Sequence, residues 1–406
     1  MKHYARVMHI NHAADANEEI LRAGASTVAS KWMAEDATMR AVFLKSVSGR
    51  AASILKQEAL TVGAECAVAH SVAAFDDTPQ SVVLIADLRR QKILAKRLRS
   101  QPFGLKRIGE EVMAAIKAHD DRSERTLTIG RHALPLGERT LVMGVINMTP
   151  DSFSGDGLGA AAGPAAKQAS RFATQGADII DIGGQSTRPG SEEMAADEEI
   201  GRVVPLIERI SGEVDLPISI DTDKAAVARA ALDAGAGMIN DVRALRGEGM
   251  LEILGERLVP VCVMHMLGTP RTMQQAPQYA DVVGDVFDFL ADRANACLQL
   301  GLPRDHIVID PGFGFGKTVN QNLTLLRRLR DFRSLGCPVL MGTSRKSTIG
   351  AVLDLPAEER VEGTAATCAC AIMNGADIIR VHDVKEMVRV ARMTDAVARG
   401  FDGGDD

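Results

Sequence analysis

Side chains able to do chemistry recur along this chain at the ends of short apolar runs. Between residues 140 and 383, eight such runs end in polar or glycine-rich residues. The chemistry-bearing residues at these ends are Asn147, Asp181, Asp221, Asn240, His265, Asp310, the turn Ser344-Arg345-Lys346, Arg380 and His382. Because a carboxylate is costly to bury unless it binds something, we expect these residues to form a site.

The residue types divide into two chemical groups. Asp221, Asp310 and Asn240 suit a heterocycle rich in N–H donors and carbonyls. We expect a cationic group to lie opposite them and to bind an anionic leaving group, and its members are Lys346, Arg380 and His382. Since Asp and Asn oxygens are also ligands of hard cations, a metal site is an alternative that the sequence leaves open.

The spacing of the apolar runs predicts how these residues are brought together. Segments of helical composition separate the runs, so strand and helix alternate eight times, which is typical of a (β/α)8 TIM barrel. In that fold the active site lies where the strands end. The predicted strands span 141–147, 177–184, 217–221, 237–241, 258–265, 306–312, 338–344 and 376–382.

The 406 residues exceed the roughly 250 of a typical barrel, which predicts a second domain. We expect a small α/β N-terminal domain over 1–125 and the barrel over 126–406, with the charged segment 118–125 as linker. The predicted strands of the N-terminal domain are 6–10, 40–47, 66–70 and 81–88, and its predicted helices are 16–25, 49–64, 89–101 and 104–119. No group of residues in the N-terminal domain indicates a catalytic or binding site.

Bulk composition excludes several classes of partner. A net charge of −6 and 3% aromatic residues argue against a nucleic-acid surface. No apolar stretch reaches the ~18 residues of a membrane span, and the N-terminus does not resemble a signal peptide. Six scattered cysteines suit reduced thiols, so we expect a cytoplasmic protein without a membrane partner.

Glycine-rich loops follow three of the predicted strands. The segment 147–157 has the composition of a lid over a barrel mouth. In 183–193, two glycines let the backbone approach a ligand closely, and Arg188 suits a carboxylate or phosphate. The segment 310–318 looks like a phosphate loop, but Pro311 stands where that pattern requires its first glycine. We therefore expect its glycines to form a floor around Asp310.

Taken together, these segments resemble dihydropteroate synthases over residues ~138–398. The motifs that carry the resemblance are GVINMTPDSFSGDG, GADIIDIGGQSTRPG, SIDT, INDV, MHMLGTPRTMQ, IDPGFGFGKT, GTSRKSTIG and IRVHDV. The resemblance implies condensation of 6-hydroxymethyl-7,8-dihydropterin diphosphate with p-aminobenzoate, giving 7,8-dihydropteroate and diphosphate. It implies small-molecule substrates, a homodimer formed through barrel helices, and a Mg²⁺ cofactor.

The resemblance also implies a role for individual residues. Pterin would be held by Asp221, Asn240, Asp310 and Lys346, of which Asp221, Asp310 and Lys346 would be catalytic. Diphosphate would meet Thr187, Arg380 and His382, with Mg²⁺ on Asn147. Aminobenzoate would lie against Arg188, Pro189 and Ser347, and Asp151 and Phe153 would belong to the lid. Asp181 and His265 are expected to support the others.

Departures from the family pattern leave alternatives open. Gln185, Asp223 and Thr348 differ from the usual residues, which puts arylamine and inhibitor preference in doubt. The alternatives are a pterin-binding methyltransferase acting with a corrinoid partner, a non-catalytic pterin-binding protein, and a synthase that uses another arylamine.

Overall fold

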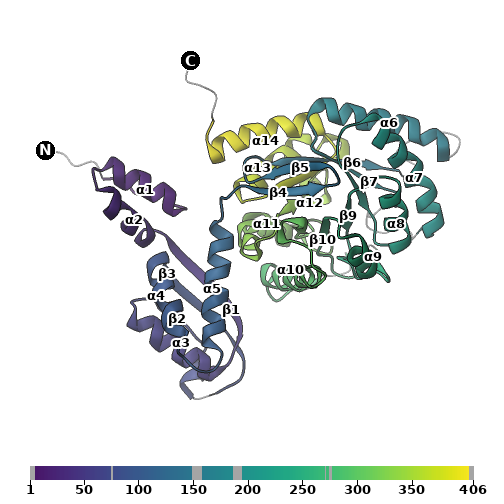
Figure 1. The fold of residues 1–406 in the computed structure, drawn as a ribbon. Coiled ribbons are helices and arrows are strands. Elements are labelled where there is room, and N and C mark those ends of the chain that lie inside the picture. Colours follow the sequence, from purple (N-terminus) through teal and green to yellow (C-terminus); the bar gives the residue numbers. More distant parts are fainter. Residues whose placement is uncertain are drawn as a thin grey trace. The chain divides into compact units, whose positions relative to one another are not determined.

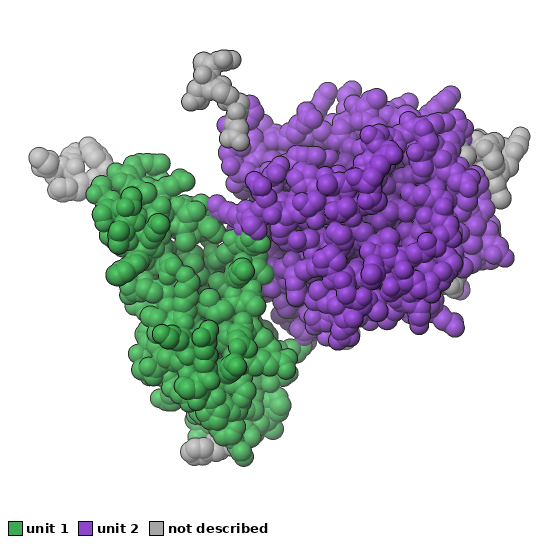
Figure 2. All heavy atoms as spheres, in the orientation of Figure 1, with its two compact units in different colours: residues 1–121 green, residues 122–406 purple. Residues whose placement is uncertain are grey.

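The chain forms two compact units, Met1–Asp121 and Arg122–Asp406, here called the N-terminal unit and the barrel unit (Figure 2). The computed structural model describes residues 5–74, 76–148, 158–185, 194–269, 271–273 and 277–401.

The N-terminal unit contains a three-stranded sheet in the order β1-β3-β2, and each neighbouring pair is antiparallel (Figure 1). Helix α3 therefore connects two parallel strands that have β3 between them, which is a split βαβ arrangement. Its strands are β1 (Met39–Val47), β2 (Glu65–Ala67) and β3 (Gln80–Asp87). Its helices are α1 (Ala13–Arg22), α2 (Thr27–Asp36), α3 (Gly49–Thr61), η1 (His70–Ala74), α4 (Leu88–Leu98) and α5 (Leu105–Asp120).

Three features of the first 136 residues differ from the sequence-based expectation. The predicted strand 6–10 is wrong: these residues belong to no strand, and the Val7 side chain is fully exposed. Helix α2 was not expected; it begins after Ser26, whose hydroxyl accepts a hydrogen bond from the backbone N–H of Ala29. The hairpin of β4 (Arg125–Ile129) and β5 (His132–Leu136) was not expected either.

The barrel unit contains the eight predicted parallel strands, in the order β11-β10-β9-β8-β7-β6-β13-β12. A bridge between Ile309 and Val339 joins the two ends of this series, so the sheet closes on itself. This confirms the predicted (β/α)8 barrel. The strands are β6 (Leu141–Asn147), β7 (Ile179–Gly183), β8 (Ile218–Asp221), β9 (Met238–Asp241), β10 (Val261–Met264), β11 (Ile307–Asp310), β12 (Leu340–Met341) and β13 (Ile378–Val381).

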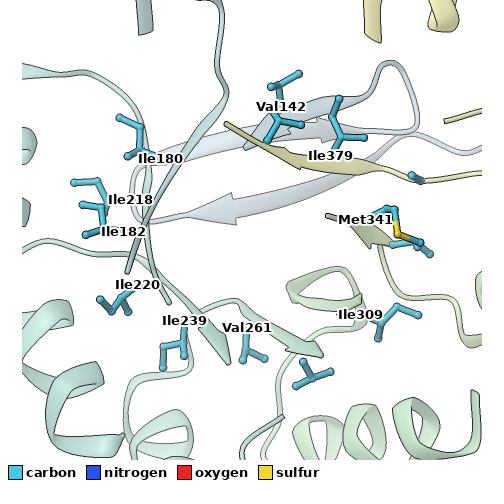
Figure 3. Packing of buried hydrophobic residues seen from close by; sticks show 14 of the residues in the cluster. Val142, Ile180, Ile182, Ile218, Ile220, Ile239, Val261, Ile309, Met341 and Ile379 are labelled. Carbon is cyan, nitrogen blue, oxygen red and sulfur yellow. The ribbon is translucent and has the colours of Figure 1, made fainter. Parts of the chain in front are cut away.

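Two sets of buried residues alternate along these strands, as period-two geometry requires. One set packs against the surrounding helices and includes Val142, Ile180, Ile220, Ile239, Val261 and Ile379 (Figure 3). The other fills the barrel near the strand starts and includes Leu141, Met143, Ile179, Met238, Val308 and Ile378. Leu127, Ile129 and Leu136 of the β4–β5 hairpin join this second set, so the hairpin closes the N-terminal end of the barrel.

Helices separate the barrel strands. They are α6 (Leu158–Gln175), α7 (Ala196–Glu213), α8 (Ala225–Asp233), α9 (Met250–Arg257), α10 (Val282–Gln299), η2 (Arg304–His306), α11 (Val319–Arg327), η3 (Leu329–Leu335), α12 (Ser347–Leu353), η4 (Ala357–Glu359), α13 (Val361–Met373) and α14 (Val384–Arg399). Within the described ranges, no helix has the length and apolar character needed to cross a membrane. All six cysteines are free thiols, and only Cys370 is exposed.

Candidate active site

The polar strand ends meet at the carboxyl-terminal end of the barrel. The register pairs Gly183 with Asp221 and Asp221 with Asn240 on adjacent strands. Asn147 ends β6, Asp310 ends β11, and Arg380 lies in β13. One ring of strand ends thus gathers groups that are far apart in the sequence.

Arg380 is the centre of this ring. Its Nε donates to Asp181 Oδ2 at 2.7 Å, and its Nη2 donates to Asp221 Oδ2 at 2.7 Å. Asn240 Nδ2 also donates to Asp181 Oδ2, at 3.1 Å. Burial opposes the charge of Arg380, but the two carboxylates outweigh it and raise the pKa of the guanidinium. The expectation that the cationic side chains lie opposite the carboxylates is therefore wrong for Arg380, which lies between two of them.

Burial shifts the ionisation of the carboxylates expected to hold the heterocycle. It raises the pKa of Asp221 to about 7, although Arg380 acts in the other direction. It also raises the pKa of Asp310, against the effects of Lys346 and the backbone N–H of Gly312. Burial likewise lowers the pKa of Lys346 to about 7, against the pull of Asp310. Small changes in surroundings can thus change the charge of Asp221 and Lys346 near neutral pH.

Several oxygens of the ring are open to a ligand. Asp310 Oδ1 accepts from the Gly312 N–H at 2.7 Å. Within the described residues, the second carboxylate oxygens of Asp221 and Asp310 accept no hydrogen bond, and neither does Asn240 Oδ1. These three atoms are acceptors available to N–H donors.

The glycine loop after β11 lies beside Asp310, where a floor was predicted, and its glycines closely approach neighbouring protein segments. Gly312 has a φ of +71°, and a Cβ there would lie 1.9 Å from the carbonyl oxygen of His265. A Cβ on Gly314 would lie 2.8 Å from Cδ of Lys346. Lys346 Nζ donates to the carbonyl of Phe313 and lies 4.1 Å from the centre of the Phe315 ring. The loop therefore fixes the position of this lysine.

The loop after β12 brings further expected residues to the mouth. His382 Nδ1 lies 3.0 Å from Ser344 Oγ, and Ser344 Oγ accepts from the His382 N–H at 3.2 Å. Arg345, with a φ of +58°, forms an ion pair with Asp383. Ser347 is exposed at the start of α12.

Some expected residues lie outside the described residues: Asp151, Phe153, Thr187, Arg188 and Pro189. The structure does describe the residues that depart from the family pattern. Gln185 Oε1 accepts from Lys224 Nζ at 2.5 Å, and Lys224 also bonds the buried Glu199. Asp223 pairs with Arg243. Thr348 is buried and its Oγ1 accepts from Asn322 Nδ2 at 3.0 Å.

Sequence reasoning missed one buried cation beside the site. Lys317 ends the glycine loop and is 3% exposed, and its Nζ lies 3.0 Å from Nδ1 of His265. A lysine directly after a run of glycines was visible in the sequence. It was passed over because the segment does not fit the phosphate-loop pattern. His265 supports this lysine, which agrees with the expected supporting role.

Comparisons with known proteins agree with this site. The family described as "Pterin binding enzyme" matches residues 143–382. A dihydropteroate synthase of Synechocystis sp. is 46% identical over 275 residues, which are 67% of this chain and 95% of that protein. The solved dihydropteroate synthase of Xanthomonas albilineans in complex with 7,8-dihydropteroate is 42% identical, with a TM-score of 0.61. The match covers 68% of this chain and 99% of that one.

One relative extends beyond the barrel. A probable bifunctional folylpolyglutamate synthase/dihydropteroate synthase of Halobacterium salinarum is 39% identical over 389 residues, 96% of this chain and 46% of that protein. A match of this extent includes most of the N-terminal unit. With the barrel, the ring of strand ends and two dihydropteroate synthases matched over 95% and 99% of their own length, this chain belongs to the dihydropteroate synthase family.

Proposed function

We propose that this chain joins 6-hydroxymethyl-7,8-dihydropterin diphosphate to p-aminobenzoate, forming 7,8-dihydropteroate and diphosphate. The C–O bond to diphosphate breaks and its electron pair leaves with the diphosphate oxygen. The arylamine nitrogen then forms the new C–N bond and loses a proton to solvent or to the departing anion. A protein nucleophile is not required, and the aniline nitrogen is neutral at working pH.

One observation carries the proposal: three open acceptors and an adjacent lysine converge at the deep end of the barrel mouth. The acceptors of Asp221, Asn240 and Asp310 match the N–H donors of a reduced pterin. A buried ring that develops positive charge as diphosphate leaves is stabilised by nearby carboxylates. Lys346, held by the carbonyl of Phe313, is placed to donate to a ring carbonyl or nitrogen.

Diphosphate would be held on the same rim. The guanidinium of Arg380 would face the anion while its Nε and Nη2 stay hydrogen-bonded to Asp181 and Asp221. His382, oriented by Ser344, would also contact the anion. Both side chains are half-buried, so they would act partly shielded from water.

The residues at the mouth fit the Mg²⁺ that the family resemblance implies. A Cβ on Gly183 would lie 3.5 Å from Asn147 Oδ1 and 3.8 Å from Asp221 Oδ2, so two oxygens border one space. Within the described residues no group of three or more His, Cys, Asp or Glu could hold a metal. Mg²⁺ commonly takes one or two protein oxygens, and substrate phosphates and water complete its shell. Asn147 would hold the ion, which when bound neutralises charge on the leaving diphosphate.

The test is product formation by the purified full-length chain. With dihydropterin diphosphate, p-aminobenzoate and Mg²⁺, we expect 7,8-dihydropteroate by mass spectrometry. Asp221→Asn should lower the rate by at least about tenfold, because the neutral amide both weakens ring binding and removes a charge-assisted acceptor. Asp292→Asn, at an exposed position of α10, is the matched control. A chain that binds a pterin but forms no product with any arylamine would refute the proposal.

Three further properties belong to this proposal. The reaction is assigned to the barrel unit, so a chain beginning at Arg122 should keep activity; a start at Thr126 would remove the first residue of β4. A homodimer through the barrel helices remains a prediction, which sedimentation would test. Buried free thiols support a reducing compartment such as the cytoplasm.

A further inference from the structure

Lys317 is a fully enclosed cation that the proposed reaction does not use directly. Its Nζ lies 2.9 Å from the carbonyl oxygens of both Gly312 and Phe315. It also lies 3.3 Å from the carbonyl oxygen of His265 and 3.0 Å from Nδ1 of that ring. Within the described residues, no carboxylate bonds to it. An ammonium with three N–H donors thus meets four acceptors from two loops.

These contacts join the loop after β11 to the segment after β10. The two backbones touch closely: a Cβ on Gly312 would overlap the His265 carbonyl, and one on Gly316 would lie 2.8 Å from Cβ of Leu267. Carbonyls that face each other across so close a contact need a shared donor, because an unpaired buried carbonyl is costly. Lys317 is that donor.

The loop that Lys317 holds also holds the site. Its carbonyl at Phe313 accepts from Lys346, its Phe315 ring lies under the same ammonium, and its Gly312 N–H bonds Asp310. Displacing this loop would move the donor and the acceptor that face the ring of the substrate. The Lys317 ammonium already faces four acceptors of the two loops, so it acts on that ring through the loop.

Charge links Lys317 to the same two groups. Among the groups facing Asp310, Lys346, Lys317 and Arg380 each lower the pKa of its carboxyl, as does the Gly312 N–H. Facing Lys317 are Asp310, which favours its charge, and Lys346, which opposes it, while burial lowers its pKa to about 7. His265 adds no charge, because burial together with Lys317 and Arg246 lowers its pKa to about 3.

We infer that Lys317 is a positioning residue of the pterin site, which holds the glycine loop in place from beneath and places its ammonium on Gly312, the residue whose N–H bonds Asp310. The inference rests on the proposed function. It predicts two separable effects, one from the N–H donors and one from the charge. A residue that merely stabilised the fold would leave the pH dependence of ligand binding unchanged.

The experiment measures binding of 6-hydroxymethyl-7,8-dihydropterin diphosphate to the full-length chain by calorimetric titration between pH 5.5 and 9. Lys317→Gln keeps two N–H donors but removes the charge, and Lys317→Met removes both the N–H donors and the charge. Lys167→Met, at an exposed position of α6, is the matched control. Removing a cation beside Asp310 raises the pKa of that carboxyl, so protonation competes with binding up to a higher pH.

We expect both variants to lose affinity at pH 7 by about tenfold or more, with Lys317→Met the weaker binder. In Lys317→Gln the loss of affinity on the acidic side of the pH profile should begin about one pH unit higher than in the wild type. Wild-type affinity and an unshifted acidic side of the pH profile in Lys317→Gln would overturn the inference, as would loss of the folded state in that variant. A wild-type chain that binds no dihydropterin would refute the proposed function itself.

Discussion

The close approach at Gly312 makes a sharp prediction for Gly312→Ala. The new Cβ would lie 1.9 Å from the His265 carbonyl oxygen and 3.3 Å from Nζ of Lys317. Ordinary contacts are near 3.4 Å, so the two backbones would have to separate by roughly 1.5 Å. Rotating a side chain cannot relieve the overlap, since the nearest atom is backbone.

The cost can be worked out in two parts. At a φ of +71°, an alanine costs about 1–2 kcal/mol relative to glycine. Forcing an extra group into a packed site costs about 1–3 kcal/mol more. The free energy of unfolding should therefore fall by about 2–5 kcal/mol, and the displaced loop should lose dihydropterin affinity.

Gly130→Ala separates the two parts. Gly130, in the β4–β5 turn, has a φ of +57°, and a Cβ there would meet nothing within 4 Å. Gly130→Ala should show only the cost of placing an alanine at positive φ. This control should therefore be less destabilised than Gly312→Ala by about 2 kcal/mol. Its dihydropterin affinity should equal that of the wild type.

Urea unfolding followed by far-ultraviolet circular dichroism would measure both variants. The single tryptophan, Trp32, lies in the N-terminal unit, so its fluorescence reports that unit separately from the barrel. Equal losses of stability in Gly312→Ala and Gly130→Ala would show that the close contact has no energetic consequence, and the reasoning about this loop would fail.

Three other perturbations test different parts of the site. His265 has a pKa of about 3 in the fold, below its usual 6.5, so the stability that depends on its neutral form is complete above pH 6.5 and is lost as pH falls toward 3. Between pH 7 and 5 the wild type should lose about 2 kcal/mol more than His265→Gln in urea unfolding, and parallel curves would contradict this. Asn147→Ala should raise the Mg²⁺ concentration for half-maximal turnover by about tenfold while dihydropterin affinity without metal stays constant; an unchanged Mg²⁺ requirement would remove Asn147 from the metal site. Arg380→Met leaves Asp181 and Asp221 without their shared partner. The free energy of unfolding, measured by thermal unfolding, should fall by about 3–5 kcal/mol at pH 8. The loss should be smaller at pH 5, because burial raises the pKa of Asp221 to about 7 and this carboxyl can then protonate, and a loss independent of pH would argue against the ion pair.

The sequence predicted the barrel well because each of its strands is a short apolar run with a polar end. The prediction failed where a segment's structure depends on a partner. Val7 belongs to a short run that includes Met8 and Ile10, but among the residues that the structure describes no strand pairs with it. The β4–β5 hairpin was overlooked even though Leu127 and Ile129 alternate with threonines before Gly130, a signal for a strand and a turn.

The sequence predicted which residues form the site better than it predicted which of them bond to one another. Asp221, Asn240 and Asp310 reach the same end of the barrel because parallel strands share an edge. The partners of Arg380 could not be predicted, since they lie 199 and 159 residues away and depend on side-chain length and direction inside the barrel. The partners of Lys317 were likewise not predictable: its four acceptors include a ring and a carbonyl 52 residues away.

The hairpin that closes the N-terminal end of the barrel has a kinetic consequence. With Leu127, Ile129 and Leu136 filling that end, everything that reaches the deep acceptors must enter and leave by the same opening. A bound arylamine near the rim would block the path of the pterin, so binding should be ordered, with the pterin first. In the proposed site diphosphate lies at the rim, so it can depart before 7,8-dihydropteroate does, and accumulated 7,8-dihydropteroate should inhibit competitively against the pterin substrate.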